Sequence, residues 1–294
     1  MVVKVLIIIP GQERKMSDLT EDLMGELLAE TGHHDLLLFP VLNRFKDIRA
    51  KSMPEIVGLE SQITSLFSRL ARSFGLYLSP GYIIEKNGSG FYRSAILFDP
   101  AGDLVLKQRQ LFLTGREQRN GLLKGRELKV LDTRLGQIGF LVGRDCYYPE
   151  VARFLTLQGV DIVLAINEQQ AMNCWQQLAG VWSQVQQNQF YALETATAGQ
   201  DLIHGPCEIS PYRTGVLAPR GSRSEALTLN PTDYFQVLAA KVKRLAGFKL
   251  VAGRLDQERL RKIRTEYPLK DYLNPRLYEK SGLKTLLPRK RVGR

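Results

Sequence analysis

The sequence predicts a single α/β domain in which layers of β-sheet are covered by helices. Apolar runs of strand length, among them Val3 to Ile9 and Val160 to Ile166, alternate with amphipathic segments of helical period. Between Tyr82 and Asp132 the pattern changes to strands joined by turns, which favours a mixed sheet over a purely parallel one. The chain has 294 residues, 44% of them hydrophobic, and neither an internal repeat nor a linker, so it can bury one sizeable core.

The first third of the chain predicts the order strand, helix, strand, helix, strand. Val3 to Ile9 is continuous, β-branched and apolar, as expected for a strand buried on both faces. A helix should follow, with Asp18 and Glu21 as its N-terminal capping pair and Gly32 at its end. The next strand, helix and strand are predicted at Asp35 to Phe39, Ile63 to Phe74 and Leu76 to Ser79.

The later helices and strands are predicted from the spacing of apolar residues and from the turn residues between them. Pro149 suits the first position of a helix that stops at Gly159. Apolar residues at helical spacing from Trp175 to Val185 indicate a further helix. Strands are predicted at Tyr92 to Phe98, Asp103 to Lys107, Leu128 to Asp132, Gly136 to Val142, Val160 to Ile166, Tyr191 to Ala196, Asp201 to Ile209 and Gly247 to Ala252.

The composition argues against a metal-binding, membrane-spanning or secreted protein. Three scattered cysteines and three histidines show no ligand spacing, so we expect no metal site and no bound cofactor. The apolar runs are too short to cross a bilayer, and residues 1 to 10 lack the features of a signal peptide. We therefore expect a cytoplasmic protein with reduced thiols.

The net charge of +11 is concentrated near the C-terminus. Lys241 to Arg294 holds 17 basic and 5 acidic residues, whereas the rest of the chain holds 24 basic and 25 acidic residues. Such a region could bind nucleic acid or an acidic partner. A solvated basic tail over residues 279–294 is the more common explanation of the same pattern, and no aromatic side chains are interleaved with it.

The most informative stretch runs from Gly136 to Gly159 and combines a buried strand, a turn and a helix. The strand ends in the turn Gly143-Arg144-Asp145-Cys146, and the helix begins at Pro149. Many enzymes expose a nucleophile at such a turn. Here Gly143 stands at the turn, so the stretch has the form of an active site without the nucleophile.

With its surroundings, this stretch resembles the nitrilase, or carbon-nitrogen hydrolase, superfamily, and the resemblance spans Val3 to Tyr278. The other motifs that carry it are Phe39-Pro40, the hairpin Tyr92 to Gly102, the run Lys107 to Glu117, Gln187-Asn188 with Tyr191, Gly205 with Ile209 and Pro211, and Asp256, Arg264, Pro268 and Tyr278. The resemblance implies a four-layer αββα sandwich over residues 1–278. It also implies homodimers that pair through the helices after the turn and after Trp175, and catalysis by a Glu, a Lys and a Cys.

All three catalytic positions that the resemblance implies are changed in this chain. The family's Glu follows the Phe-Pro pair, where this chain has Val41. Its Lys lies seven residues before a retained accessory Glu, here Glu117, which gives Gln110. Its Cys lies two residues before the Asp of the turn, Asp145, which gives Gly143. Valine cannot move a proton, glutamine carries no charge and glycine has no nucleophile, so the resemblance implies a degenerate site.

Other side chains could replace the missing groups. Lys107 or Arg109 could supply a cation, but strand alternation turns both away from the face used by Gln110. Cys146 could supply a nucleophile, but it lies three residues past the turn, where the chain enters a helix. Cys174 is a further candidate, and packing at the start of a helix explains it better.

The leading hypothesis is a catalytically inactive family member that binds a small ligand or a protein partner. The ligand-binding residues that the resemblance implies are Glu117, Tyr147, Tyr148, Asn167 and Trp175. An alternative is an active amidohydrolase that acts on non-peptide C–N bonds with Cys146 as a relocated nucleophile. A third hypothesis is that the basic C-terminal region binds nucleic acid or an acidic partner.

Overall fold

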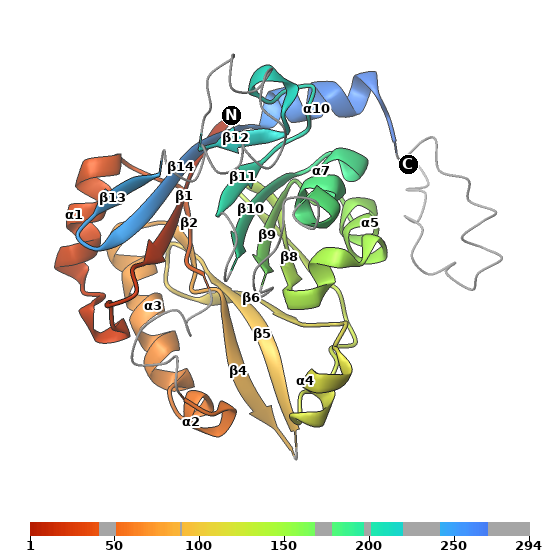
Figure 1. The fold of residues 1–294 in the computed structure, drawn as a ribbon. Coiled ribbons are helices and arrows are strands. Elements are labelled where there is room, and N and C mark those ends of the chain that lie inside the picture. Colours follow the sequence, from red (N-terminus) through yellow and green to blue (C-terminus); the bar gives the residue numbers. More distant parts are fainter. Residues whose placement is uncertain (41–50, 89, 168–177, 197–200, 220–241, 270–294) are drawn as a thin grey trace, which may run out of the picture.

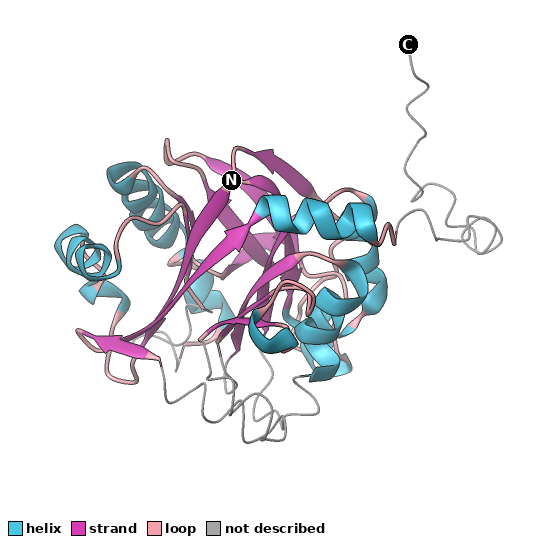
Figure 2. Cartoon of the chain, turned by 90° about the horizontal axis from the view of Figure 1, so that it is seen from above, coloured by secondary structure: helices cyan, strands magenta, loops and turns pink. Residues whose placement is uncertain are grey.

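The structure is a computed structural model that describes residues 1–40, 51–88, 90–167, 178–196, 201–219 and 242–269. In this part of the chain two β-sheets lie face to face, and helices cover the outer face of each (Figure 1). Figure 2 shows the same arrangement from above, with helices on both sides of the strands. The four-layer αββα sandwich implied by the resemblance is confirmed.

Within the described residues the first sheet has eight strands in the order β13-β14-β1-β2-β3-β5-β4, with β6 also paired to β5. The bounds are β1 (Val2–Pro10), β2 (Leu36–Leu38), β3 (Tyr77–Ser79), β4 (Tyr82–Asn87), β5 (Gly90–Phe98), β6 (Leu104–Arg109), β13 (Lys243–Leu245) and β14 (Phe248–Asp256). Strand β1 pairs parallel with β2 and antiparallel with β14, so the sheet is mixed, as predicted.

The second sheet has six described strands in the order β12-β11-β10-β9-β8-β7. The bounds are β7 (Val130–Thr133), β8 (Gly136–Val142), β9 (Ile162–Asn167), β10 (Tyr191–Ala196), β11 (Leu202–His204) and β12 (Val216–Ala218). Strands β8, β9 and β10 run parallel. Their carboxyl ends therefore meet at one edge of the sheet, where ligands of α/β proteins commonly bind.

The described helices lie outside the two sheets or at their ends. The α-helices are α1 (Glu21–Thr31), α2 (Met53–Val57), α3 (Glu60–Phe74), α4 (Gly115–Arg119), α5 (Pro149–Leu157), α7 (Ser183–Asn188) and α10 (Gln257–Glu266). Shorter turns are η1 (Met16–Asp18), η3 (Gly143–Tyr147), η4 (Leu178–Trp182) and η5 (Pro211–Arg213). No helix in the described ranges is long and apolar enough to cross a membrane.

Three apolar clusters hold the layers together. The largest lies between the sheets and includes Ile7, Leu97 and Phe140, all fully buried. A second joins α1 and α3 to the first sheet, and a third joins α5 and α7 to the second. Because a strand buried on both faces must be apolar throughout, these clusters explain the continuous apolar runs of β1, β8 and β9.

The structure corrects some local predictions. Thr20, rather than Asp18, caps α1, since its hydroxyl accepts a hydrogen bond from the Leu23 N–H at 3.2 Å. The strand predicted to reach Ile209 ends at His204, just before Pro206, which has no N–H to donate to a neighbouring strand. The sequence did not indicate β12, β13, α4 or α10. In α10 the buried hydrophobic residues are Leu260 and Ile263, and two apolar residues are too few to predict an amphipathic helix from the sequence.

Candidate functional site

The site forms where β8 ends at Val142 and the chain turns through η3. Gly143 begins this turn with φ +55°, in the left-handed region that favours glycine. Val142 pairs with Ile166 of the parallel strand β9, and Asn167 ends that strand. Gly143 and Asn167 therefore lie at the same edge of the second sheet.

Gln110 fills the space in which a side chain at position 143 would lie. A β-carbon built on Gly143 would be 2.9–3.0 Å from the amide Oε1, Cδ and Nε2 of Gln110. Gln110 is only 1% exposed. Its Nε2 donates to the Phe112 carbonyl at 2.7 Å, and its Oε1 accepts from the Arg93 guanidinium at 2.6 Å. The Gln110 amide, held in place from both ends, thus occupies the space beside Gly143, and these are two of the three positions that the resemblance assigns to the triad.

Glu117 joins this group through an ion pair with Arg93. Nη1 of Arg93 lies 2.6 Å from Glu117 Oε1, and both side chains are largely buried. Burial alone would raise the pKa of Glu117, but hydrogen bonds from Thr114 and the charge of Arg93 hold it below its usual value. Glu117 also caps α4, because its Oε2 accepts the Thr114 N–H at 2.6 Å. Both oxygens of the Glu117 carboxylate therefore accept hydrogen bonds from neighbouring residues, so the carboxylate is not a free base.

Asp145 ties the turn to the segment that follows β6. Its Oδ1 accepts the Phe112 N–H at 2.8 Å and the Leu111 N–H at 3.1 Å. Asp145 is 1% exposed, and burial raises its pKa to about 7 although these hydrogen bonds favour the ionised form. This contact keeps Gln110 and Gly143 together, since it fixes the two segments that carry them.

Cys146 lies in the apolar layer between α5 and the second sheet. It is fully buried in the cluster that contains Leu141, Val151 and Leu155, and its thiol lies 3.8 Å from the Leu141 carbonyl. Burial raises the pKa of the thiol well above its usual value. A neutral, enclosed thiol is a poor nucleophile, because the thiolate is the reactive form.

A second polar group runs from Asn167 at the end of β9, through Glu194 within β10, to His204 on β11. Asn167 Nδ2 donates to the Tyr147 hydroxyl at 2.8 Å and to Glu194 Oε1 at 3.1 Å. The other oxygen of Glu194 lies 2.8 Å from His204 Nε2. Asn167 and His204 have no exposed surface, and Glu194 has 1%. The four side chains form one buried chain of hydrogen bonds, and burial raises the pKa of Tyr147.

The ligand-binding residues that the resemblance implies do not all lie together in the structure. Tyr147 and Asn167 are in contact, but Tyr148 stacks on Phe112 with ring centroids 3.8 Å apart and is 37% exposed. Lys107 and Arg109 lie on the opposite face of β6 from Gln110, where both pair with Glu85. Val41, Cys174, Trp175 and the tail 279–294 lie outside the described residues.

Sequence reasoning missed Arg93, Glu194 and His204. Arg93 follows Tyr92 in β5, and strand alternation would have placed it on the inner face with Ala95 and Leu97. Glu194 interrupts an otherwise apolar strand, and a charge in a buried strand requires a partner. That partner, His204, comes from the neighbouring strand, and only the register of β10 and β11 reveals the pair.

Among the described residues, Gln110, Arg93 and Glu117 gather at the turn, and the one cysteine near it, Cys146, is buried. Arg93 joins Gln110 to Glu117, through a hydrogen bond to the Gln110 amide and an ion pair with Glu117. In the described ranges no cluster of three or more His, Cys, Asp or Glu side chains could hold a metal ion. The described side chains at this edge offer hydrogen-bond donors and acceptors.

Comparison with known proteins assigns the family. The model of the carbon-nitrogen hydrolase family matches residues 35–225, more than half of the chain, and this chain belongs to that family. A nitrilase from Pyrococcus abyssi is 31% identical over 35% of this chain and 39% of its own length. An omega-amidase from Xenopus laevis is 24% identical over 78% of this chain and 79% of its own length.

Solved structures support the same fold. The crystal structure of a carbon-nitrogen hydrolase from Helicobacter pylori G27 matches with a TM-score of 0.73 and 15% identity. The match covers 95% of this chain and 98% of that one. At this identity the likeness concerns the fold alone, so the activity of this chain must be inferred from its own residues.

Proposed function

We propose that this chain is a catalytically inactive carbon-nitrogen hydrolase that acts by binding a small ligand or a protein partner. The observation that carries the proposal is the contact between Gln110 and Gly143. The position that the resemblance assigns to the nucleophile has no side chain, and a neutral amide occupies the adjoining space. An active site of this class needs both a nucleophile and a positive charge to stabilise the oxyanion.

The surroundings of Cys146 support inactivity over a relocated nucleophile. Its thiol is enclosed under α5 and points toward Leu141, whereas Gln110 and Gly143 meet at the edge of the sheet. A substrate would have to displace part of the α5 layer to reach the sulfur. The raised pKa of Cys146 adds a second obstacle, since little thiolate is present at neutral pH.

Binding of a small polar ligand is supported by the side chains at the carboxyl ends of β8 and β9. Gln110, Tyr147 and Asn167 place amide and hydroxyl groups at this edge, and a ligand would take over hydrogen bonds that these groups now make within the protein. Such groups orient a ligand through hydrogen bonds without cleaving it.

A homodimer is the partner arrangement that we propose, through the outer faces of α5 and α7. The two helices pack side by side, with Arg153 donating to the Gln187 carbonyl at 3.2 Å. Together they cover one outer face of the sandwich (Figure 1). Sedimentation equilibrium should give twice the 33.3 kDa chain mass. A monomer at micromolar concentration would contradict this part of the proposal.

Inactivity is tested by incubating the purified chain with a panel of amides and nitriles and measuring released ammonia. We expect no release above the rate of a protein-free blank. Ammonia release that disappears in Cys146→Ala would overturn the proposal and establish the relocated nucleophile.

A further inference from the structure

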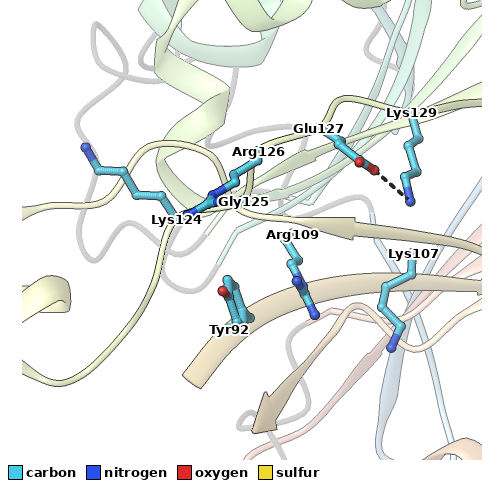
Figure 3. Close-up of a pocket in the computed structure, with 8 residues that line it drawn as sticks. All are labelled: Tyr92, Lys107, Arg109, Lys124, Gly125, Arg126, Glu127 and Lys129. Carbon is cyan, nitrogen blue, oxygen red and sulfur yellow. Dashed lines mark ion pairs between the residues drawn. The ribbon is translucent and has the colours of Figure 1, made fainter. Parts of the chain in front are cut away.

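A basic cleft lies on the outer face of the first sheet, on the opposite side of β6 from Gln110. Five of its eight lining residues are basic, and its volume is about 560 Å³. Figure 3 shows Lys107 and Arg109 on the strands and the segment 124–129 beside them. The lining residues are Tyr92, Lys107, Arg109, Lys124, Gly125, Arg126, Glu127 and Lys129.

The cleft is built by specific backbone contacts. The Gly125 N–H donates to the Gln110 carbonyl at 2.7 Å. Gln108 donates to the Glu127 carbonyl at 2.7 Å and accepts the Lys129 N–H at 3.0 Å. A β-carbon on Gly125 would lie 2.8 Å from the carbonyl oxygen of Arg109, so glycine permits this close approach. The loop that carries three of the basic residues is therefore fixed against β6.

The floor of the cleft is also held in place. The Arg109 guanidinium lies over the Tyr92 ring, 3.9 Å from its centroid. Arg109 and Lys107 both pair with Glu85, at 2.6 and 2.8 Å. Because Glu85 is nearly buried beneath them, the two cations are oriented in advance and retain donors for a ligand.

The charges of the cleft do not cancel. Glu127 pairs with Lys129 at 3.2 Å, and Glu85 lies below Lys107 and Arg109. Within the described residues, Lys124 and Arg126 make no ion pair, and both are exposed. Five basic and two acidic side chains leave a net charge of +3 around one hollow.

We propose that this cleft binds an oligophosphate, a ligand with two or more linked phosphate groups that is either free or carried by a nucleotide. The three to four negative charges of such a ligand match the net charge of the cleft. Guanidinium groups bind phosphate oxygens in pairs, and ammonium groups add point charges, so the mixture of Arg and Lys suits this chemistry. The cleft does not depend on the vestigial triad, because the side chains of the two sites leave β6 on opposite faces.

The test is calorimetric titration of the full chain with inorganic tripolyphosphate at 50 and 200 mM salt. We expect binding that weakens as salt rises. Lys124→Gln/Arg126→Gln should lower the affinity at least about tenfold, since two charged contacts are lost. The matched control Arg259→Gln/Arg261→Gln removes the same charge from exposed positions on α10 and should change the affinity less than about twofold.

The outcomes separate the possible sources of the ligand. Equal affinity for tripolyphosphate and ATP supports a free oligophosphate. Tighter binding of ATP that Tyr92→Ala abolishes supports a nucleotide. Absence of tripolyphosphate binding overturns the proposal, as does an equal loss in the control variant. Binding of single-stranded RNA without binding of tripolyphosphate would assign the cleft to nucleic acid and would also overturn it.

Discussion

Gly143→Ala should destabilise the chain more than Gly75→Ala does. Both glycines have left-handed backbones, with φ +55° and +62°. At Gly75 a β-carbon would meet nothing within 4 Å, whereas at Gly143 it would press on the Gln110 amide at 2.9–3.0 Å. The left-handed conformation costs a non-glycine residue about 1–2 kcal/mol. Overpacking adds about 1–3 kcal/mol, so we expect about 2–5 kcal/mol for Gly143→Ala.

Urea denaturation of the two variants and the wild-type chain measures the difference directly. Gly75→Ala isolates the backbone cost, and the excess at Gly143 reports the contact with Gln110. If Gly143→Ala costs no more than Gly75→Ala, Gln110 does not occupy the space beside Gly143. The reasoning that links the two changed positions would then be wrong.

Three further predictions concern the neighbouring charges and thiols. Glu117→Gln should cost on the order of 3 kcal/mol of unfolding free energy, because it leaves the charge of Arg93 buried; the same change at the exposed Glu30 should cost under about 1 kcal/mol. Because the folded pKa of Asp145 is about 7, the folded chain keeps a proton that the unfolded chain releases above pH 4. Between pH 4 and pH 7 the unfolding free energy of the wild-type chain should therefore fall by up to about 4 kcal/mol more than that of Asp145→Asn, which has no carboxyl group to titrate. Equal pH profiles of the two chains would refute the raised pKa. In the native chain iodoacetamide should label Cys207 and spare the buried Cys146, as checked by peptide mass spectrometry, and selective labelling of Cys146 would contradict its burial.

Much of the fold can be predicted from local sequence, because the spacing of apolar residues along the chain shows which faces of a helix or strand are buried. The runs that form β1, β8 and β9 are continuous because both of their faces are covered. Pro149 begins α5 as its fixed φ predicts. Short elements such as β12 and β13 escape prediction, since three residues hold too little pattern and their pairing depends on distant strands.

The candidate site could be proposed from the sequence, but the contacts of its side chains could not. The resemblance singles out Gln110 and Gly143, but that the Gln110 amide lies beside Gly143 depends on how the segments after β6 and β8 meet. The pair of Glu194 and His204 arises from the register of two strands. The basic cleft likewise joins Arg109 to residues 124–129 through a loop whose path no local pattern specifies.

The central claim, that the vestigial site does no hydrolysis, is tested most directly by comparing ammonia release from the wild-type chain and from a chain with the triad restored. The restored chain carries Val41→Glu, Gln110→Lys and Gly143→Cys, and both chains receive the same amides and nitriles. We predict no release above the blank from the wild-type chain, and release from the restored chain would show that the substrates suit this fold. Sustained release by the wild-type chain, at a rate proportional to protein concentration, would contradict the claim.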